Sequence, residues 1–260
     1  MISVKPKKSL GQHFLTDANI ARKIVDSLTF SNYDQVLEIG PGMGVLSIYL
    51  LELSEKKVRF IEIDRSSVEY LNEHFPEIRD KLYDGDVMRI DTAEFFDGPF
   101  AVIGNFPYNI SSQLFFKILE NKDQITEVVC MLQKEVARRL ASPPGSREYG
   151  ILSVLLQGYY KIEYLFTVPP QVFNPPPKVQ SAVIRLQRNE RQALPCNEVL
   201  FKKVVKTAFN QRRKVLRNSL RSLYRPDSMQ DEIFRKRPEQ LGVEDFVKLA
   251  VLAEGHAGIK

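Results

Sequence analysis

Short apolar runs alternate with amphipathic stretches along the first half of the chain. Apolar runs between turn residues are typical of buried strands, and we expect strands over 36–39, 58–63, 82–83, 100–104 and 127–132. Apolar residues at helical spacing predict helices over 17–28, 45–53, 66–75 and 111–119, with Thr16 or Asp17 capping the first. This alternation predicts an α/β fold, a parallel sheet with helices on both faces.

The pattern changes in the second half of the chain. Strands over 162–168 and 179–186 flank the proline-rich loop 169–177 without an intervening helix, which predicts an antiparallel edge of the sheet. After about residue 189 no strand pattern recurs, and helices are expected over 200–209, 215–223 and 243–253. We therefore expect a larger α/β domain over 1–190 and a small C-terminal all-helical domain over 191–260.

Composition limits the class of protein. The 260 residues are 43% hydrophobic, enough for one large domain with an appendage, and the formal net charge of +5 suits a polyanionic partner. Cys130 and Cys196 are not clustered, which favours a reducing compartment. His13, His74 and His256 are far apart and adjoin no cysteine, so we expect no zinc site. No apolar run has membrane-spanning length and the N-terminus is not a secretory signal, so we expect a cytoplasmic protein.

Glycines and acids follow the first expected strands. Gly40, Gly42 and Gly44 would let a ligand approach the backbone and the following helix N-terminus, although a tight turn is the simpler alternative. Glu62, at the end of the next strand, can accept both hydroxyls of a ribose, or be a salt-bridged acid. Asp86 can accept the amine of a cofactor adenine, although a turn aspartate is the commoner interpretation. Because carboxyl ends of parallel strands meet at one edge, these residues predict a nucleoside site.

The most informative segment is Asn105-Phe106-Pro107-Tyr108, directly after the strand over 100–104. The exocyclic amine of adenine is a poor nucleophile because its lone pair is delocalised into the ring. Asn105 Oδ1 and the Phe106 carbonyl can accept its two hydrogens and favour a localised lone pair. Pro107 stiffens the loop and Tyr108 can stack on an extruded base. The alternative is an ordinary strand-end turn.

Phe173 lies between two proline clusters of the loop 169–177. The prolines could hold its ring as a second stacking face for the base. The alternative, about equally supported by the local sequence, is a core phenylalanine that anchors a long loop.

Cations gather in the helical segment without an intervening acid between Glu198 and Asp227. They are Lys202, Lys203, Lys206, Arg212, Arg213, Lys214, Arg217, Arg221 and Arg225, and Lys5, Lys7 and Lys8 could extend the patch. A solvated face is the usual explanation for charge runs, but so one-sided a set favours a phosphate-binding surface. Phosphate contacts do not distinguish RNA from DNA.

Taken together, these residues resemble the ribosomal RNA adenine N6-dimethyltransferase family, and within it the bacterial enzymes of the small ribosomal subunit. The matching segments cover nearly the whole chain in order: 9–15, 38–44, 61–64, 85–87, 105–108, 172–181 and 208–214. The resemblance implies a Rossmann-like domain that uses S-adenosylmethionine, and a helical RNA-binding domain. It implies two methyl groups on each of two adjacent adenines near the 3′ end of small-subunit rRNA, within an immature 30S subunit. We expect a monomer with no metal and no membrane partner.

The resemblance also assigns site residues by position. The cofactor site comprises Gln12, His13, Leu15, Gly40, Gly42, Glu62, Asp86, Val87 and Asn105, with Phe14 helping to close it, and the catalytic site comprises Asn105, Phe106, Pro107, Tyr108 and Phe173. The family often has asparagine at the position of His13 and leucine at that of Phe106. A backbone contact from His13, and a carbonyl contact from Phe106, would make both departures harmless.

Three alternatives stay open. A large-subunit rRNA adenine methyltransferase of the antibiotic-resistance type shares the core motifs, although segment 175–181 and the basic tail favour the small-subunit enzyme. A ribosome-assembly factor that methylates only secondarily is possible, although the intact pocket residues argue against pure binding. A nicotinamide dehydrogenase could use the glycine loop and Glu62, but it gives Asn105–Tyr108 no role.

Overall fold

A seven-stranded sheet forms the centre of the fold in the computed structural model, which describes residues 4–257. Its strand order is β4-β3-β2-β5-β6-β9-β7. The strands are β2 (Gln35–Ile39), β3 (Lys57–Glu62), β4 (Leu82–Asp84), β5 (Phe100–Asn105), β6 (Ile125–Gln133), β7 (Tyr160–Val168) and β9 (Ser181–Arg188). The pairs β2–β3, β2–β5, β3–β4 and β5–β6 are parallel, and β9 pairs antiparallel with β6. The predicted parallel sheet with an antiparallel addition is therefore confirmed.

Four helices of the α/β pattern lie where the sequence predicted them: one precedes the first sheet strand, and three follow strands. They are α1 (Ala18–Val25), α2 (Ser47–Leu51), α3 (Arg65–His74) and α4 (Ser111–Glu120). Asp17 is the cap of α1, since its Oδ1 accepts from the backbone N–H groups of Asn19 and Ile20 at 2.9 and 3.0 Å. Helix α2 is shorter than the expected 45–53.

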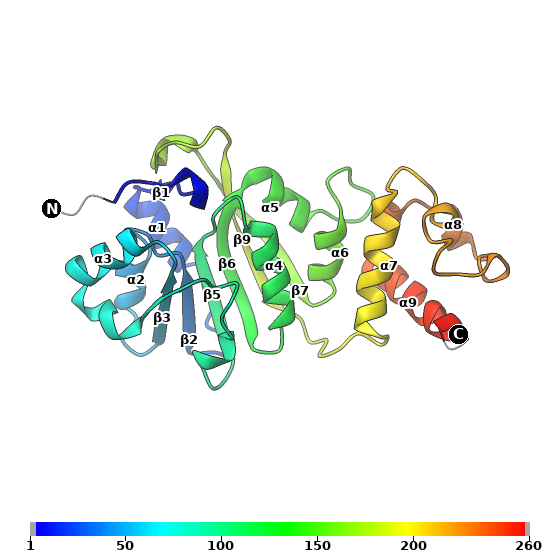
Figure 1. The fold of residues 1–260 in the computed structure, drawn as a ribbon, viewed down its shortest axis with the longest axis horizontal. Helices are drawn as coiled ribbons and strands as arrows, with labels where there is room; N and C mark the ends of the chain where they lie inside the picture. The colour runs from blue at the N-terminus through cyan, green and yellow to red at the C-terminus, as the bar shows by residue number, and fades with distance from the viewer. Residues whose placement is uncertain (1–3, 258–260) are drawn as a thin grey trace. The chain divides into compact units, whose positions relative to one another are not determined.

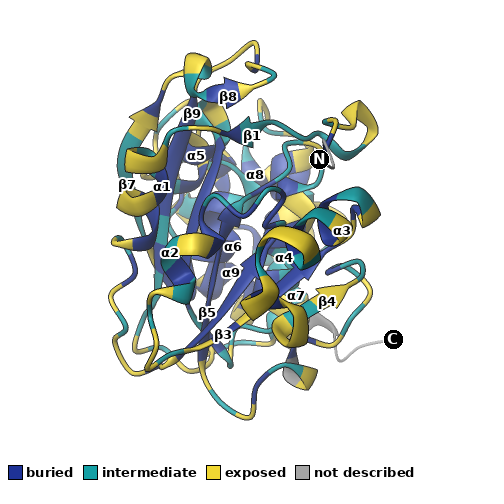
Figure 2. Cartoon of the chain, turned by 90° about the vertical axis from the view of Figure 1, so that its left-hand side faces the viewer, coloured by how far each residue is buried: buried dark blue, intermediate teal, exposed yellow. Residues whose placement is uncertain are grey.

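Apolar residues alternate between the two faces of the central strands. Val36, Ala101, Ile103, Val129 and Met131 share one core cluster with buried residues of α1, α2 and α3. The intervening residues face the other side, where α4 lies in front of the sheet (Figure 1). Figure 2 shows the result: central strands such as β5 are buried, whereas the edge strands β4 and β7 are partly exposed. Both faces of the sheet are covered, as runs without polar alternation require.

The N-terminal segment is joined to the loop before β9 by a second, two-stranded sheet. Strand β1 (Phe14–Leu15) pairs antiparallel with β8 (Phe173–Asn174), and the Thr16 N–H donates to the Val172 carbonyl at 2.8 Å. Figure 1 shows the blue N-terminal segment beside the yellow-green loop. We call residues 7–16 the N-terminal strap.

The chain divides into two compact units, residues 1–137 with 162–188 and residues 138–161 with 189–260. The second unit contains the end of α5 (Lys134–Ala141), then α6 (Ile151–Gln157), α7 (Glu198–Asn210), α8 (Leu216–Ser219) and α9 (Val243–Ala257). Helices α5 and α6 were not predicted, and α8 is shorter than the expected 215–223. The boundary expected at about residue 190 coincides with one crossing between the units, but the inclusion of 138–161 was not foreseen.

The second unit has its own aromatic core. The ring of Phe209 on α7 lies 6.2 Å from that of Tyr149 and 5.9 Å from that of Phe246 on α9. Short 3-10 helices complete the two units, at Lys8–Leu10, Pro76–Lys81, Thr92–Glu94, Pro170–Val172, Pro226–Ser228, Glu232–Arg235 and Pro238–Gln240. Within residues 4–257, no helix combines the length and apolar character of a transmembrane span.

Candidate active site

A cavity of about 180 Å³ opens at the carboxyl ends of β2, β3, β4 and β5. The strand order reverses between β2 and β5, which is where open α/β sheets bind ligands. The predicted site residues that line it are Gln12, His13, Phe14, Gly40, Gly42, Glu62, Asp86, Val87, Asn105, Phe106, Pro107 and Tyr108. Residues separated by almost a hundred positions are thus brought together as the sequence predicted.

The glycine loop and Glu62 form one connected unit. Gly40 and Gly42 have φ values of 70° and 60°, in the left-handed region that favours glycine. The Glu62 carboxylate accepts from the Gly42 N–H through Oε2 at 2.9 Å and from the Asp64 N–H through Oε1 at 2.8 Å. Burial raises the pKa of Glu62 above its usual range. The loop conformation and the carboxylate therefore fix each other.

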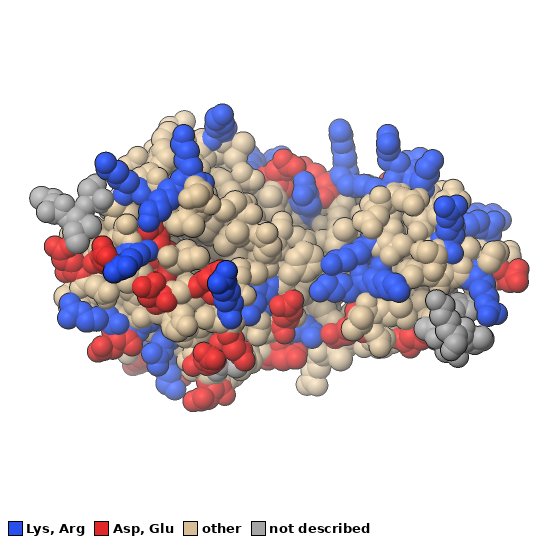
Figure 3. All heavy atoms as spheres, in the orientation of Figure 1, with Lys and Arg blue, Asp and Glu red and all other residues tan. Residues whose placement is uncertain are grey.

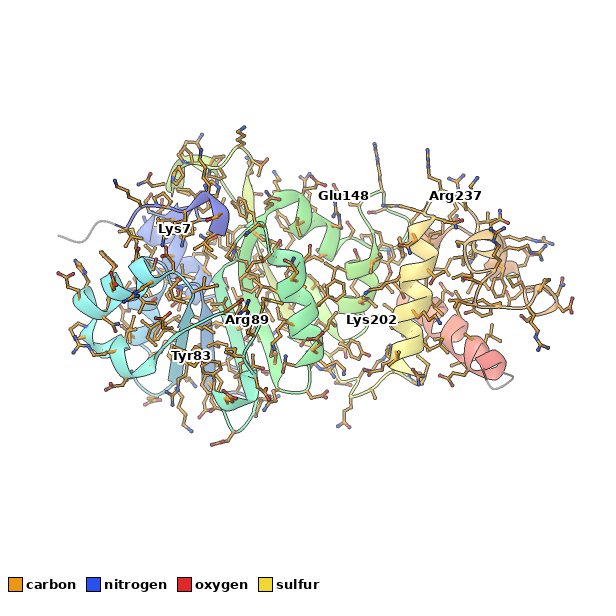
Figure 4. The ribbon with its side chains drawn as sticks, in the orientation of Figure 1. Lys7, Tyr83, Arg89, Glu148, Lys202 and Arg237 are labelled. Atoms are coloured by element: carbon orange, nitrogen blue, oxygen red, sulfur yellow. The ribbon has the colours of Figure 1, made fainter. Side chains whose placement is uncertain are left out.

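Asp86 begins the next part of the wall. Its Oδ1 accepts from the Met88 N–H at 2.9 Å, and its Oδ2 lies 3.6 Å from Arg89 Nε, at the exposed surface (Figure 4). Val87 beside it is buried and lines the cavity. Asp86 is thus both the turn aspartate of the simpler alternative and a cavity residue.

Asn105 ends β5 at the floor of the cavity. Its Nδ2 donates to the His13 carbonyl at 2.8 Å, which leaves Oδ1 available to accept. The preceding Gly104 has no room for a side chain, because an added Cβ would lie 2.4 Å from the Ile39 carbonyl oxygen of β2. The position of Asn105 is therefore set by close contact of two strands.

Phe106 and Tyr108, which follow Asn105, are held by contacts to β6, α4 and β9. The Phe106 N–H donates to the Met131 carbonyl at 2.9 Å, and its fully buried ring packs 6.0 Å from Phe115 of α4. The Tyr108 hydroxyl lies 2.5 Å from Ser181 Oγ of β9, and burial raises the pKa of Tyr108, so the phenol stays protonated. The Phe106 ring and N–H are thus held within the core, the role of its carbonyl stays a prediction, and the Tyr108 hydroxyl is anchored to β9.

The N-terminal strap crosses the cavity and is tied down on both sides. Lys7 Nζ donates to Asp64 Oδ1 at 2.5 Å, and Gln12 Nε2 donates to Asp64 Oδ2 at 3.0 Å (Figure 4 labels Lys7). On the far side, His13 Nδ1 donates to the Pro175 carbonyl at 2.7 Å. Burial opposes ionisation of Asp64, but the bonds from Lys7 and Gln12 hold its pKa below its usual value. Sequence reasoning assigned Asp64 no role, although its place two residues after Glu62 was visible.

His13 makes both a backbone and a side-chain contribution. Its carbonyl accepts from Asn105 and orients that side chain, a backbone role that does not depend on the His13 side chain, whereas a backbone contact to the cofactor stays a prediction. Its ring lies 5.3 Å from that of Tyr108, tilted by 30°. The imidazole must carry its proton on Nδ1 to donate to Pro175, so Nε2 is the acceptor in the neutral form.

Leu15 and Phe173 lie elsewhere. They face each other across the β1–β8 pair, with 3% and 4% of their surfaces exposed, and belong to the core cluster under the strap. Phe173 therefore occupies the position of the core alternative in this conformation, and its ring is not part of the cavity wall. A stacking role for it would require the β1–β8 pair to open.

The lining of the cavity suits S-adenosylmethionine. Its charged members are the carboxylates Glu62 and Asp86, and no Lys or Arg of the described residues lines it. Acceptors match ribose hydroxyls, an adenine amine and a sulfonium cation, and Ile39, Ile61 and Ile63 offer apolar contact. In the described part of the chain, no group of three His, Cys, Asp or Glu side chains is arranged to hold a metal ion.

The predicted RNA-binding cations lie on the second unit, and Figure 3 shows Lys and Arg side chains over α7 and around α8. Lys203, Lys206, Arg213, Lys214, Arg217 and Arg221 are exposed, and Lys202 is half-buried. Arg212 is committed to its own unit, since it donates to the carbonyls of Ser146 and Arg147 at 3.3 and 2.6 Å. Arg217 donates to the Met229 carbonyl at 2.7 Å.

The fold and the cavity define a Rossmann-like α/β protein with a site suited to a nucleoside cofactor. The chain belongs to the ribosomal RNA adenine dimethylase family, whose model matches residues 3–250. Membership makes it an rRNA adenine dimethyltransferase that uses S-adenosylmethionine.

Its relatives cover the full chain. The ribosomal RNA small subunit methyltransferase A of Parabacteroides distasonis is 55% identical over 255 residues, which are 97% of this chain and 96% of that protein. The protein of the same name from Porphyromonas gingivalis is 56% identical over 258 residues, 98% and 100% of the two chains.

Two solved structures resemble the whole fold. The crystal structure of a dimethyladenosine transferase from Plasmodium falciparum has a TM-score of 0.80 at 25% identity, covering 94% of this chain and 98% of that one. The 23S rRNA methyltransferase ErmE has a TM-score of 0.64 at 25% identity, covering 92% and 99%.

Proposed function

We propose that this enzyme dimethylates N6 of two adjacent adenines near the 3′ end of small-subunit rRNA, acting in the cytoplasm on an immature 30S subunit. The relatives at 55% and 56% identity over nearly the full chain carry the small-subunit name, whereas the similarity to the 23S enzyme is 25%. This difference in identity favours the small-subunit substrate over the large-subunit alternative.

The observation that carries the proposed chemistry is the fixed orientation of Asn105. S-adenosylmethionine supplies a methyl group on a sulfonium centre, open to in-line attack by a nitrogen lone pair. Asn105 Oδ1 accepts one hydrogen of the adenine amine, because Nδ2 is already committed to the His13 carbonyl. The Phe106 carbonyl accepts the other hydrogen. Together they localise the lone pair on N6, so the residues act by positioning and by oriented dipoles.

Pro107 and Tyr108 complete the acceptor side. Pro107 has a restricted φ and keeps the Phe106 carbonyl in place. The Tyr108 ring, anchored through Ser181, offers a face to the extruded base. A strong base is unnecessary, because a purine amine that has gained a methyl group is acidic enough to lose its proton after the transfer.

The cations of the second unit are proposed to contact rRNA phosphates. Lys203, Arg213, Lys214 and Arg221 are exposed and suit this role, whereas Arg212 is used within the unit. Such contacts add affinity but little sequence information.

The test is methylation of small subunits from a strain that lacks the enzyme, followed by mapping of modified adenines in both rRNAs. We expect dimethyladenosine at two adjacent small-subunit positions, and none with Asn105→Ala, which should still bind the subunits. Methylation of large-subunit rRNA instead would overturn the assignment. Binding of immature subunits by the wild type without methyl transfer would favour the assembly-factor alternative.

A further inference from the structure

A second cavity, of about 560 Å³, lies against the first on the other side of the strap. The two cavities share the residues Gly11, Gln12, His13 and Tyr108. The strap and the Tyr108 ring therefore form a common wall, with the cofactor side at Glu62 and the other side at the proline-rich loop before β9. A nucleotide whose base enters between them would leave its backbone in the second cavity.

The two cavities have opposite charge. The charged residues in the wall of the first are Glu62 and Asp86, whereas those of the second are Lys8 and Lys178. No acidic side chain of the described residues lines the second cavity. A phosphodiester is repelled from the first and attracted to the second, since opposite charges at a partly desolvated surface attract more strongly than in bulk water. The polarity matches a donor on one side and a nucleic acid strand on the other.

Lys8 and Lys178 also differ from the lysines beside them. Lys7 is bound to Asp64, and Lys134 Nζ donates to Gln180 Oε1 at 2.7 Å. Within residues 4–257, neither the Lys8 nor the Lys178 ammonium group forms a hydrogen bond or an ion pair with another protein group. Both are exposed, and the β1–β8 pair with the His13–Pro175 hydrogen bond brings their segments together.

We propose that the second cavity binds the phosphates flanking the target adenosine, with Lys8 and Lys178 as the two phosphate contacts. This rests on the proposed function, because it takes single-stranded rRNA as the ligand. The contacts lie in the same compact unit as Asn105. They position the target nucleotide itself, whereas the cations of the second unit add affinity for RNA in general. Because they read the backbone, they serve each of the two adjacent adenines alike.

The first test is the salt dependence of RNA binding by the double variant Lys8→Ala/Lys178→Ala. Each lost contact to single-stranded RNA lowers the slope of log K against log salt by about 0.7, so the slope should fall by about 1.4. Affinity at low salt should fall about tenfold or more, with S-adenosylmethionine affinity and thermal unfolding unchanged. The matched control is Lys57→Ala/Lys81→Ala, two exposed lysines at the amino ends of β3 and β4 in the same unit.

The second test places the phosphates. An RNA fragment with uncharged methylphosphonate linkages on both sides of the target adenosine should bind the wild type more weakly, by the same factor as the double variant loses. The double variant should bind the methylphosphonate RNA and unmodified RNA with the same affinity. The inference is wrong if the methylphosphonate linkages weaken RNA binding equally in the wild type and the double variant. It is also wrong if Lys57→Ala/Lys81→Ala weakens RNA binding as much as the double variant does. Methylation by the wild type would still uphold the proposed function in either case. Failure of the wild type to methylate small subunits would overturn the proposed function, and with it the inference.

Discussion

Glu38 is a buried acid whose protonation should govern how the stability of the larger unit varies with pH. It lies in β2 with 1% of its surface exposed, and Ser47 Oγ donates to its Oε2 at 2.7 Å. Burial, and to a lesser extent the charge of Glu62, raises the pKa of Glu38 to about 8 from an ordinary value of 4.5. The informative change is Glu38→Gln, which keeps the volume and the bond from Ser47 and removes the charge at every pH.

The sign follows from linkage. A carboxyl whose pKa is raised by folding binds its proton more tightly in the native state. Its contribution to stability is therefore complete below the unfolded pKa of 4.5 and is lost as the pH rises through about 8. At about 1.4 kcal/mol per pH unit the full loss is about 5 kcal/mol. Between pH 5.5 and 8.5, the free energy of unfolding of Glu38→Gln should rise relative to wild type by about 3 kcal/mol.

Urea unfolding followed by circular dichroism at several pH values measures this difference. Taking the variant minus wild type cancels the titration of the groups that do not interact with Glu38. The exposed Glu55→Gln serves as the matched control and should show a constant difference. If the difference for Glu38→Gln also stays constant within about 0.5 kcal/mol over this range, the carboxyl is not protonated in the native state and the reasoning is wrong.

Three further changes probe the strap, the strand contact and the motif. Asp64→Asn keeps the cap of α3 but weakens the bond to the half-exposed Lys7. Hydrogen exchange of the backbone amides of residues 7–16 should therefore accelerate about fivefold, which corresponds to a loss of about 1 kcal/mol. An unchanged exchange rate would contradict this. Gly104→Ala places a Cβ 2.4 Å from the Ile39 carbonyl and should cost about 1–3 kcal/mol in urea unfolding, with a larger loss of methyl transfer as Asn105 moves. Phe106→Leu should cost about 1 kcal/mol, yet leave the rate of methyl transfer within a few-fold, because the ring is fully buried and the proposed contact of this residue to the substrate is its carbonyl; a large rate loss would assign the ring a direct role.

The lining of the first cavity was predictable from the sequence because its geometry is local to each strand end. Gly40, Glu62, Asp86 and Asn105 each follow an apolar run, and parallel pairing alone brings such positions to one edge. No knowledge of side-chain packing was needed, since the register of β2, β3 and β5 fixes where the strands end.

The resemblance placed the strap at the site, but its contacts were not predictable from the local sequence, because they join residues far apart in the chain. Lys7 meets Asp64 across 57 positions and His13 meets Pro175 across 162. The same non-local pairing decided Phe173, for which the local sequence was evenly divided: the β1–β8 register buries its ring against Leu15. Whether a loop side chain is buried depends on a partner segment distant in the sequence, which hydrophobic periodicity does not identify.

The missed helices have a different cause. Residues 134–141 carry apolar Val136, Ala137 and Leu140 at helical spacing, so the signal for α5 was present. Residues 151–157 form a nearly continuous apolar run, which fits a buried strand or a buried helix equally well. Helix α6 belongs to the second unit because it packs against α7, which lies about 50 positions later in the chain.

The β1–β8 pair links the active site to the order of synthesis. A growing chain that has not reached residue 172 already contains the glycine loop, Glu62 and Asn105, but it has no partner for Phe14 and Leu15. The strap then lacks its far anchor, and the two cavities have no common wall. The ribosome must therefore add more than 150 residues after the strap before the site that acts on ribosomal RNA can close. A chain that ends before residue 172 contains the strand ends that line the first cavity and lacks the residues that pair with the strap.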